Sequence, residues 1–203
     1  MATSTPEPLG HLPLPPHPRR PEIDNRTLKL LVGVIAIALP ILTDVLTDCR
    51  ILSISESYYE TGTASTLFVG SLFAIAAFLL AYNGRSRLQM VLSKVGGVAS
   101  ALIALFPCDC GRIKGPGVHY AAAAVLFLIL AFFCHAFYKR SFMSRYPQAQ
   151  ARRVVYLASF VGIMGAIAAL ALHAIQHHGN TQDPSRFVFY GEAVGLFAFG
   201  TRG

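Results

Sequence analysis

The sequence predicts an all-α polytopic membrane protein, a bundle of six transmembrane helices with a short interfacial segment after the first helix. Hydrophobic residues make up 54% of the 203-residue chain and charged residues only 13%, and the mean hydropathy is +0.51. Soluble domains carry about 25% charged residues. Two further observations support this fold class: apolar stretches recur along the chain, and the charges between them are unequally distributed.

The six apolar stretches cover residues 28–48, 66–82, 91–107, 118–138, 153–176 and 187–200. A helix needs about 20 apolar residues to cross the hydrocarbon core of a bilayer. The first, fourth and fifth stretches meet this length, the second and third lie near its lower limit, and the last is shorter. Pro40 removes a backbone hydrogen bond and is expected to bend the first helix.

Small residues spaced four apart predict close helix packing, because they let two backbones approach each other in lipid. Three such pairs occur: Gly70 with Ala74, Gly97 with Ala101, and Gly162 with Ala166.

The connecting segments divide into two groups of different charge. If successive segments alternate between two sides of a membrane, one side receives 13 of the 17 Lys and Arg but only three of the ten Asp and Glu. Short loops rich in Lys and Arg remain cytoplasmic. The pattern predicts a multi-pass protein of the plasma membrane (the bacterial inner membrane) with both termini in the cytoplasm. The net charge of +7 then reflects orientation and attraction to membrane lipid, and we expect no nucleic-acid partner.

The chain divides into a tail and one membrane domain. Residues 1–27 hold seven prolines and lack the apolar core of a cleavable signal peptide, so they predict a disordered Pro-rich cytoplasmic tail. Residues 28–203 predict a single six-helix transmembrane domain. Within it, residues 49–65 are too polar to span the bilayer and too apolar for a free loop. We therefore expect a short interfacial or partly re-entrant element there, with Tyr58 and Tyr59 at headgroup level.

Polar residues that do not belong in lipid gather near the predicted outer end of the bundle. Ionisable groups inside a membrane usually face the bundle interior and mark a functional site. The candidate ligand pocket consists of Asp44, Ser53, Ser55, Tyr59, His119 and Glu192. This composition predicts binding or transport of a small polar or lipid-headgroup ligand, and it favours no cofactor.

Histidines offer two alternatives. His173 and His177 are four residues apart, so they share a helix face and can bind one zinc ion with His119 as the third ligand and water as the fourth. The chain would then be a metal-dependent hydrolase. The other alternative is a haem held between His119 and His173.

Three cysteines, Cys49, Cys108 and Cys110, fall on the predicted outer side, where oxidising conditions permit a disulfide. A bond from Cys49 to either Cys108 or Cys110 would hold residues 49–65 over the mouth of the bundle. Free thiols are the alternative.

Several short motifs resemble those of a group of small uncharacterised bacterial six-helix integral membrane proteins. They are, in order, TDVLTDC, SISESYY, FPCDCG, HYAAA and FYGEAVGLFAFG. The group shares a Ser-x-Ser-x-x-Tyr-Tyr stretch after helix one, a Phe-Pro motif closing helix three, a histidine opening helix four and a glutamate in the last helix. The resemblance implies a membrane location and no particular reaction.

The HxxxH pair, with a distant histidine, serine and aspartate, also resembles the alkaline ceramidase and adiponectin-receptor superfamily of intramembrane hydrolases. That resemblance implies a zinc-dependent hydrolase of lipid amide or ester bonds. The superfamily has seven helices and carries HxxxH on the last one, whereas this pair falls on the fifth of six.

Overall fold

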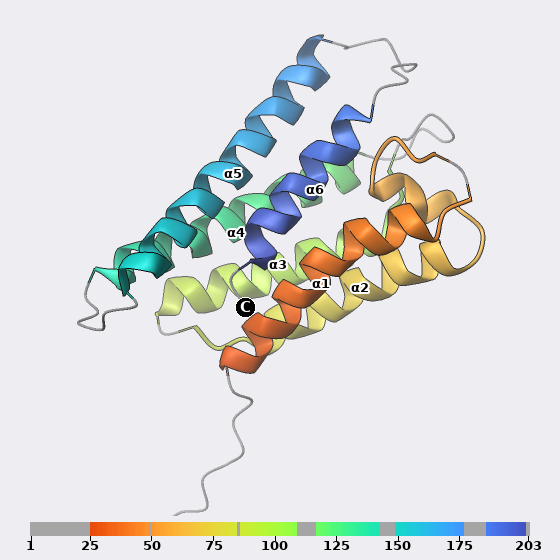
Figure 1. Cartoon of the computed structure of the whole chain (residues 1–203). Helices are drawn as coiled ribbons and strands as arrows, with labels where there is room; N and C mark the ends of the chain where they lie inside the picture. Colours follow the sequence, from red (N-terminus) through yellow and green to blue (C-terminus); the bar gives the residue numbers. More distant parts are fainter. Residues whose placement is uncertain are drawn as a thin grey trace, which may run out of the picture.

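The computed structural model describes residues 25–48, 50–84, 86–108, 117–142, 149–176 and 186–201. These residues form six α-helices and one short 3-10 helix, η1 (Ser55–Tyr59), and no strand occurs among them. The helices are α1 (Asn25–Val45), α2 (Thr63–Ala81), α3 (Arg87–Leu105), α4 (Val118–Ser141), α5 (Ala149–Gln176) and α6 (Phe187–Gly200) (Figure 1). Each predicted apolar stretch overlaps one helix, so the all-α prediction is confirmed. Most of the predicted tail lies outside the described residues, and α1 begins within its last three.

Five of the helices, α1 to α5, are long and apolar enough to cross a membrane, whereas α6 has 14 residues. Their outward faces are apolar as well. Val45 is 74% exposed, Ile175 is 70% exposed and Val154 is 66% exposed. An aqueous surface seldom carries so many highly exposed large apolar side chains, because water penalises their exposure.

The helices form a closed ring. Each one packs against its neighbours in the sequence, and α6 also packs against α1 (Figure 1). A smaller contact between α4 and α6 also closes a ring of the other five helices, with α5 packed on its outside. Accordingly, 17% of the apolar window of α5 is buried, compared with 33–39% for the other four long helices. The interior is therefore bounded chiefly by α1, α2, α3, α4 and α6.

Side chains satisfy the backbone groups that helix ends leave without partners. Ser86 caps the start of α3 by accepting a hydrogen bond from the Gln89 backbone N–H at 3.2 Å. Ser93 of α3 donates to the Tyr82 carbonyl at the end of α2 at 3.1 Å. Arg153 of α5 donates to the Ser141 carbonyl at the end of α4 at 3.2 Å. A cationic side chain at a helix C-terminus also interacts favourably with the helix dipole.

The small-residue pairs have different outcomes. A Cβ on Gly97 would lie 3.0 Å from the Ala76 carbonyl oxygen, so this glycine permits the close approach of α2 and α3. A Cβ on Gly162 would lie 3.1 Å from Ala198 of α6. At Gly70 the prediction that another helix of this chain approaches closely is wrong, because a Cβ there would meet no atom within 4 Å.

Candidate functional site

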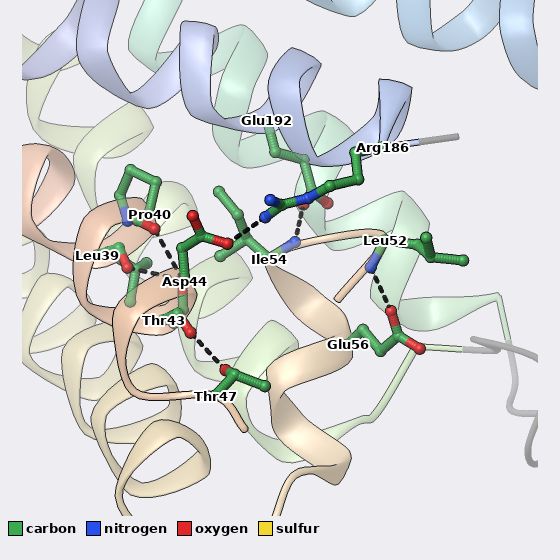
Figure 2. A network of polar contacts seen from close by, with 10 residues as sticks. All are labelled: Leu39, Pro40, Thr43, Asp44, Thr47, Leu52, Ile54, Glu56, Arg186 and Glu192. Atoms are coloured by element: carbon green, nitrogen blue, oxygen red, sulfur yellow. Dashed lines mark hydrogen bonds and ion pairs between the residues drawn. The ribbon is translucent and has the colours of Figure 1, made fainter. Parts of the chain in front are cut away.

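Residues 51–59, here called the lid segment, fold against the ends of α1, α2 and α6. Short polar contacts within the segment set its shape. The Glu56 carboxylate accepts from the Leu52 backbone N–H at 2.6 Å (Figure 2). The Glu56 backbone N–H donates to Ser53 Oγ at 3.1 Å. Ser57 Oγ donates to the Ile54 carbonyl at 2.6 Å. The predicted interfacial element is thus a single 3-10 turn with its own hydrogen bonds.

Glu192 of α6 attaches the lid segment to the bundle. Its carboxylate accepts from the Ile54 backbone N–H at 2.6 Å (Figure 2). It also accepts from Ser55 Oγ at 3.0 Å. The Phe189 backbone N–H, in the first turn of α6, donates to the Leu52 carbonyl at 3.0 Å. Two of these three hydrogen bonds end on the Glu192 side chain. Glu192 is therefore the main polar anchor between these two parts of the chain.

A second attachment joins the lid segment to the residues that follow α3. Tyr59 Oη donates to the Cys108 carbonyl at 2.6 Å. The start of α4 is held to the same region, because the His119 ring contacts the Phe106 carbonyl through Nδ1 at 2.8 Å. Cys108 is disulfide-bonded. Both other candidates, Cys49 and Cys110, lie outside the described residues, and Cys134 is a buried thiol.

The lid segment covers a cavity of about 60 Å³ inside the ring. Helices α1, α2, α3, α4 and α6 line it together with η1, and α5 contributes nothing to its wall. The wall is apolar apart from Ser55, His119 and Glu192. A site of roughly 10–15 Å³ holds one water molecule, so the cavity has room for a small chemical group.

The polar groups of the cavity wall offer mainly hydrogen-bond acceptors. Ser55 and Ile54 already donate to Glu192, whose two carboxylate oxygens have lone pairs beyond those two bonds. A carbonyl oxygen only accepts, so His119 Nδ1 carries the proton in its contact with Phe106. A neutral His119 ring then has an unprotonated Nε2. The site is therefore suited to a group that donates hydrogen bonds.

The structure brings together three of the six predicted pocket residues. Ser55, His119 and Glu192 line the cavity, whereas Asp44, Ser53 and Tyr59 are not among its lining residues. Ser53 and Tyr59 shape and attach the lid segment instead. The Asp44 side chain is 45% exposed and forms an ion pair with Arg186 (Figure 2).

Arg186 is a residue that the sequence reasoning did not single out. Only 13% of its side chain is exposed, and its guanidinium lies 4.1 Å from the centre of the Phe189 ring. Such stacking of a cation on an aromatic face is favourable. The ion pair with Asp44 connects the end of α1 to the residue before α6. One signal was available in the sequence, because Arg186 is one of only four cations on the predicted outer side.

Among the described residues, no three His, Cys, Asp or Glu side chains lie close enough together to hold a metal ion. His119 occupies the cavity wall, and the ring of His173 stacks on Phe187 with centres 4.8 Å apart. His177, the remaining ligand of the alternative zinc site, lies outside the described part of the chain.

Comparisons with protein-family models, curated proteins and solved structures gave no match.

Proposed function

We propose that this chain is a multi-pass protein of the bacterial inner membrane, with six membrane-crossing helices and both termini in the cytoplasm. The five long apolar helices and their apolar outward faces support a bilayer as the solvent. Helix α6 is about 21 Å long, which is less than the hydrocarbon thickness of about 30 Å. The lid segment is hydrogen-bonded to Phe189 and Glu192 of α6. At the proposed outer end of this short helix, polar groups therefore have partners within the protein.

In this proposal the protein binds or transports a small polar or lipid-headgroup ligand in the cavity beneath the lid segment. One observation supports it above the others: Ser55, His119 and Glu192 come from three separate elements and converge on one largely apolar cavity. Enclosed apolar pockets with a few convergent polar groups are the usual form of a ligand site. The acceptor groups favour a ligand that carries a hydroxyl or an amine.

Photolabelling tests the proposal with an uncharged hydroxyl probe. The full chain, purified into lipid nanodiscs, is irradiated with an octanol that carries a diazirine, and the adducts are located by peptide mass spectrometry. We expect adducts on cavity-lining residues such as Leu126 and Leu196, and competition by unlabelled octanol. His119→Phe should reduce this labelling, whereas Tyr120→Phe should not, because Tyr120 is 53% exposed and is not part of the wall. Labelling confined to outward-facing residues would reject the proposal.

A further inference from the structure

The polar side chains that line the cavity beneath the lid segment have used their donors on other parts of the protein. Ser55 donates to Glu192 at 3.0 Å, and His119 donates from Nδ1 to the Phe106 carbonyl at 2.8 Å. A carboxylate has no proton to donate, so the Glu192 oxygens and His119 Nε2 remain as acceptors. Water and alcohols both donate and accept, whereas an ammonium group only donates. The site therefore matches an ammonium group best.

The charge of the wall favours a cation as well. Glu192 brings a carboxylate to it, and no Lys or Arg of the described residues lines the cavity. Arg186, the cation that precedes α6, forms its ion pair with Asp44. A carboxylate in apolar surroundings is costly unless it is paired. A bound cation would supply such a partner for Glu192.

The size of the cavity restricts the ligand to a few non-hydrogen atoms. One water molecule needs about 10–15 Å³, so a cavity of about 60 Å³ holds roughly four to six groups of that size. An ammonium ion is close to a water molecule in size, and methylammonium adds one carbon. Phe68, Phe127 and Phe199 line the same space. Aromatic faces attract cations, most strongly where water is excluded.

The proposed outer side is acidic, which favours the approach of a cation. Its connecting segments hold four of the 17 Lys and Arg and seven of the ten Asp and Glu. An excess of one sign of charge raises the local concentration of ions of the opposite sign.

We infer that the ligand is a primary ammonium group, ammonium itself or a short alkylammonium, bound between the Glu192 carboxylate and His119 Nε2 beneath the lid segment. The inference rests on the proposed function and specifies its ligand. It excludes small anions, which would meet the Glu192 carboxylate, and bulky quaternary amines, which have no N–H to donate.

Competition against ¹³C-labelled methylammonium tests this inference with the unsubstituted full chain in phosphatidylcholine nanodiscs. Saturation-transfer NMR measures the binding, and empty nanodiscs give the background. Ammonium should compete, whereas methanol and tetramethylammonium should compete about tenfold less well, because one lacks the charge and the other lacks the donors. Absence of saturable binding overturns the inference, and so does equal competition by methanol or tetramethylammonium.

A matched pair of variants tests the role of the carboxylate. Glu192→Gln keeps an oxygen acceptor but removes the charge, so methylammonium should bind about tenfold more weakly. Glu56→Gln removes the same charge from the lid segment, at a residue outside the cavity wall, and should bind as the unsubstituted chain does. Equal binding by the two variants overturns the assignment to Glu192. The competition series needs neither variant, so it remains decisive if Glu192→Gln does not fold.

Nanodiscs that contain phosphatidylethanolamine distinguish a lipid headgroup from a free ion as the source of the ammonium group. Weaker apparent methylammonium binding in them identifies the headgroup as a competitor, and unchanged binding identifies a free ion; either result supports an ammonium site. The proposed function is separable from this inference. Octanol adducts in the cavity without methylammonium binding overturn the inference alone, whereas the absence of cavity adducts rejects the proposed function as well.

Discussion

The Glu192 carboxylate and the Ile54 backbone nitrogen lie 2.6 Å apart, although 138 residues separate them in the sequence. The same carboxylate accepts from Ser55 Oγ, so one side chain of α6 holds two consecutive residues of the lid segment. Both Glu192 and Ser55 also line the cavity beneath the lid segment. The attachment of the lid segment and the polarity of the cavity wall therefore depend on the same group.

Replacing Glu192 should loosen the lid segment. Glu192→Ala leaves the Ile54 N–H without its acceptor, and an unsatisfied buried donor costs about 1–3 kcal/mol. We expect faster amide hydrogen exchange across residues 52–57, with an intermediate effect for Glu192→Gln because the amide oxygen still accepts. Glu60→Ala, which removes a carboxylate just beyond the lid segment, is the control. Unchanged exchange in Glu192→Ala would show that the apolar contacts alone hold the segment.

The ion pair of Asp44 and Arg186 should be weakly coupled. Asp44 is 45% exposed, and pairs with an exposed partner are typically worth about 0.2–1 kcal/mol. A double-mutant cycle with Asp44→Asn and Arg186→Met measures this coupling from the unfolding free energies in mixed micelles. Arg186→Met alone should have the larger effect, because it also removes the contact with Phe189. Equal effects of the two single substitutions would contradict this assignment.

Adding a methyl group at Gly97 should separate α2 from α3. The new Cβ would lie 2.7 Å from Leu80 Cγ and 3.0 Å from a backbone oxygen, so Gly97→Ala should destabilise the protein by about 1–3 kcal/mol. Gly70→Ala is a matched control on α2, since it meets open space and improves helix propensity by roughly 0.5–1 kcal/mol. Unfolding in denaturing detergent measures both. Similar stabilities of the two variants would show that α2 and α3 adjust without cost.

The proposed orientation predicts which exposed positions an impermeant thiol reagent reaches on intact cells. Thr61→Cys, between the lid segment and α2, should react from outside. Lys139→Cys, in the last turn of α4, should react only after the membrane is permeabilised, because basic loops remain cytoplasmic. The unsubstituted chain gives the background from the native cysteines. The reverse pattern would reverse the orientation and place the lid segment in the cytoplasm.

The helices could be predicted from the sequence because each coincides with a long run of apolar residues. A run of that length has few possible structures other than a helix. Ser55, His119 and Glu192 could be predicted as a group because polar residues in apolar surroundings are expensive unless they face the interior. Asp44 satisfied the same criterion, yet it lies near the end of α1, where its side chain remains half-exposed and pairs with Arg186. Depth along a helix was thus predicted better than the direction in which a side chain points.

A second cavity in the bundle, of about 40 Å³, could not be predicted for a different reason. Its wall consists of residues such as Phe133, Phe137 and Leu79, which the sequence does not distinguish from any other core residue. Whether neighbouring aromatic rings fill a space or leave a gap depends on packing details. The spacing of apolar residues in the sequence does not determine those details. Likewise, Gly70 and Gly97 have the same sequence spacing to a small residue, but only Gly97 faces another helix.

The lid segment is synthesised long before α6, and this order has a consequence for folding. Ile54 is synthesised 138 residues before Glu192, an interval of roughly 7–28 s at ordinary translation speeds. During that time the Ile54 amide and the Ser55 hydroxyl have no carboxylate to bind. A chain that stops before α6 would therefore lack the acceptor for both groups, so the lid segment gains this attachment only after α6 has been made.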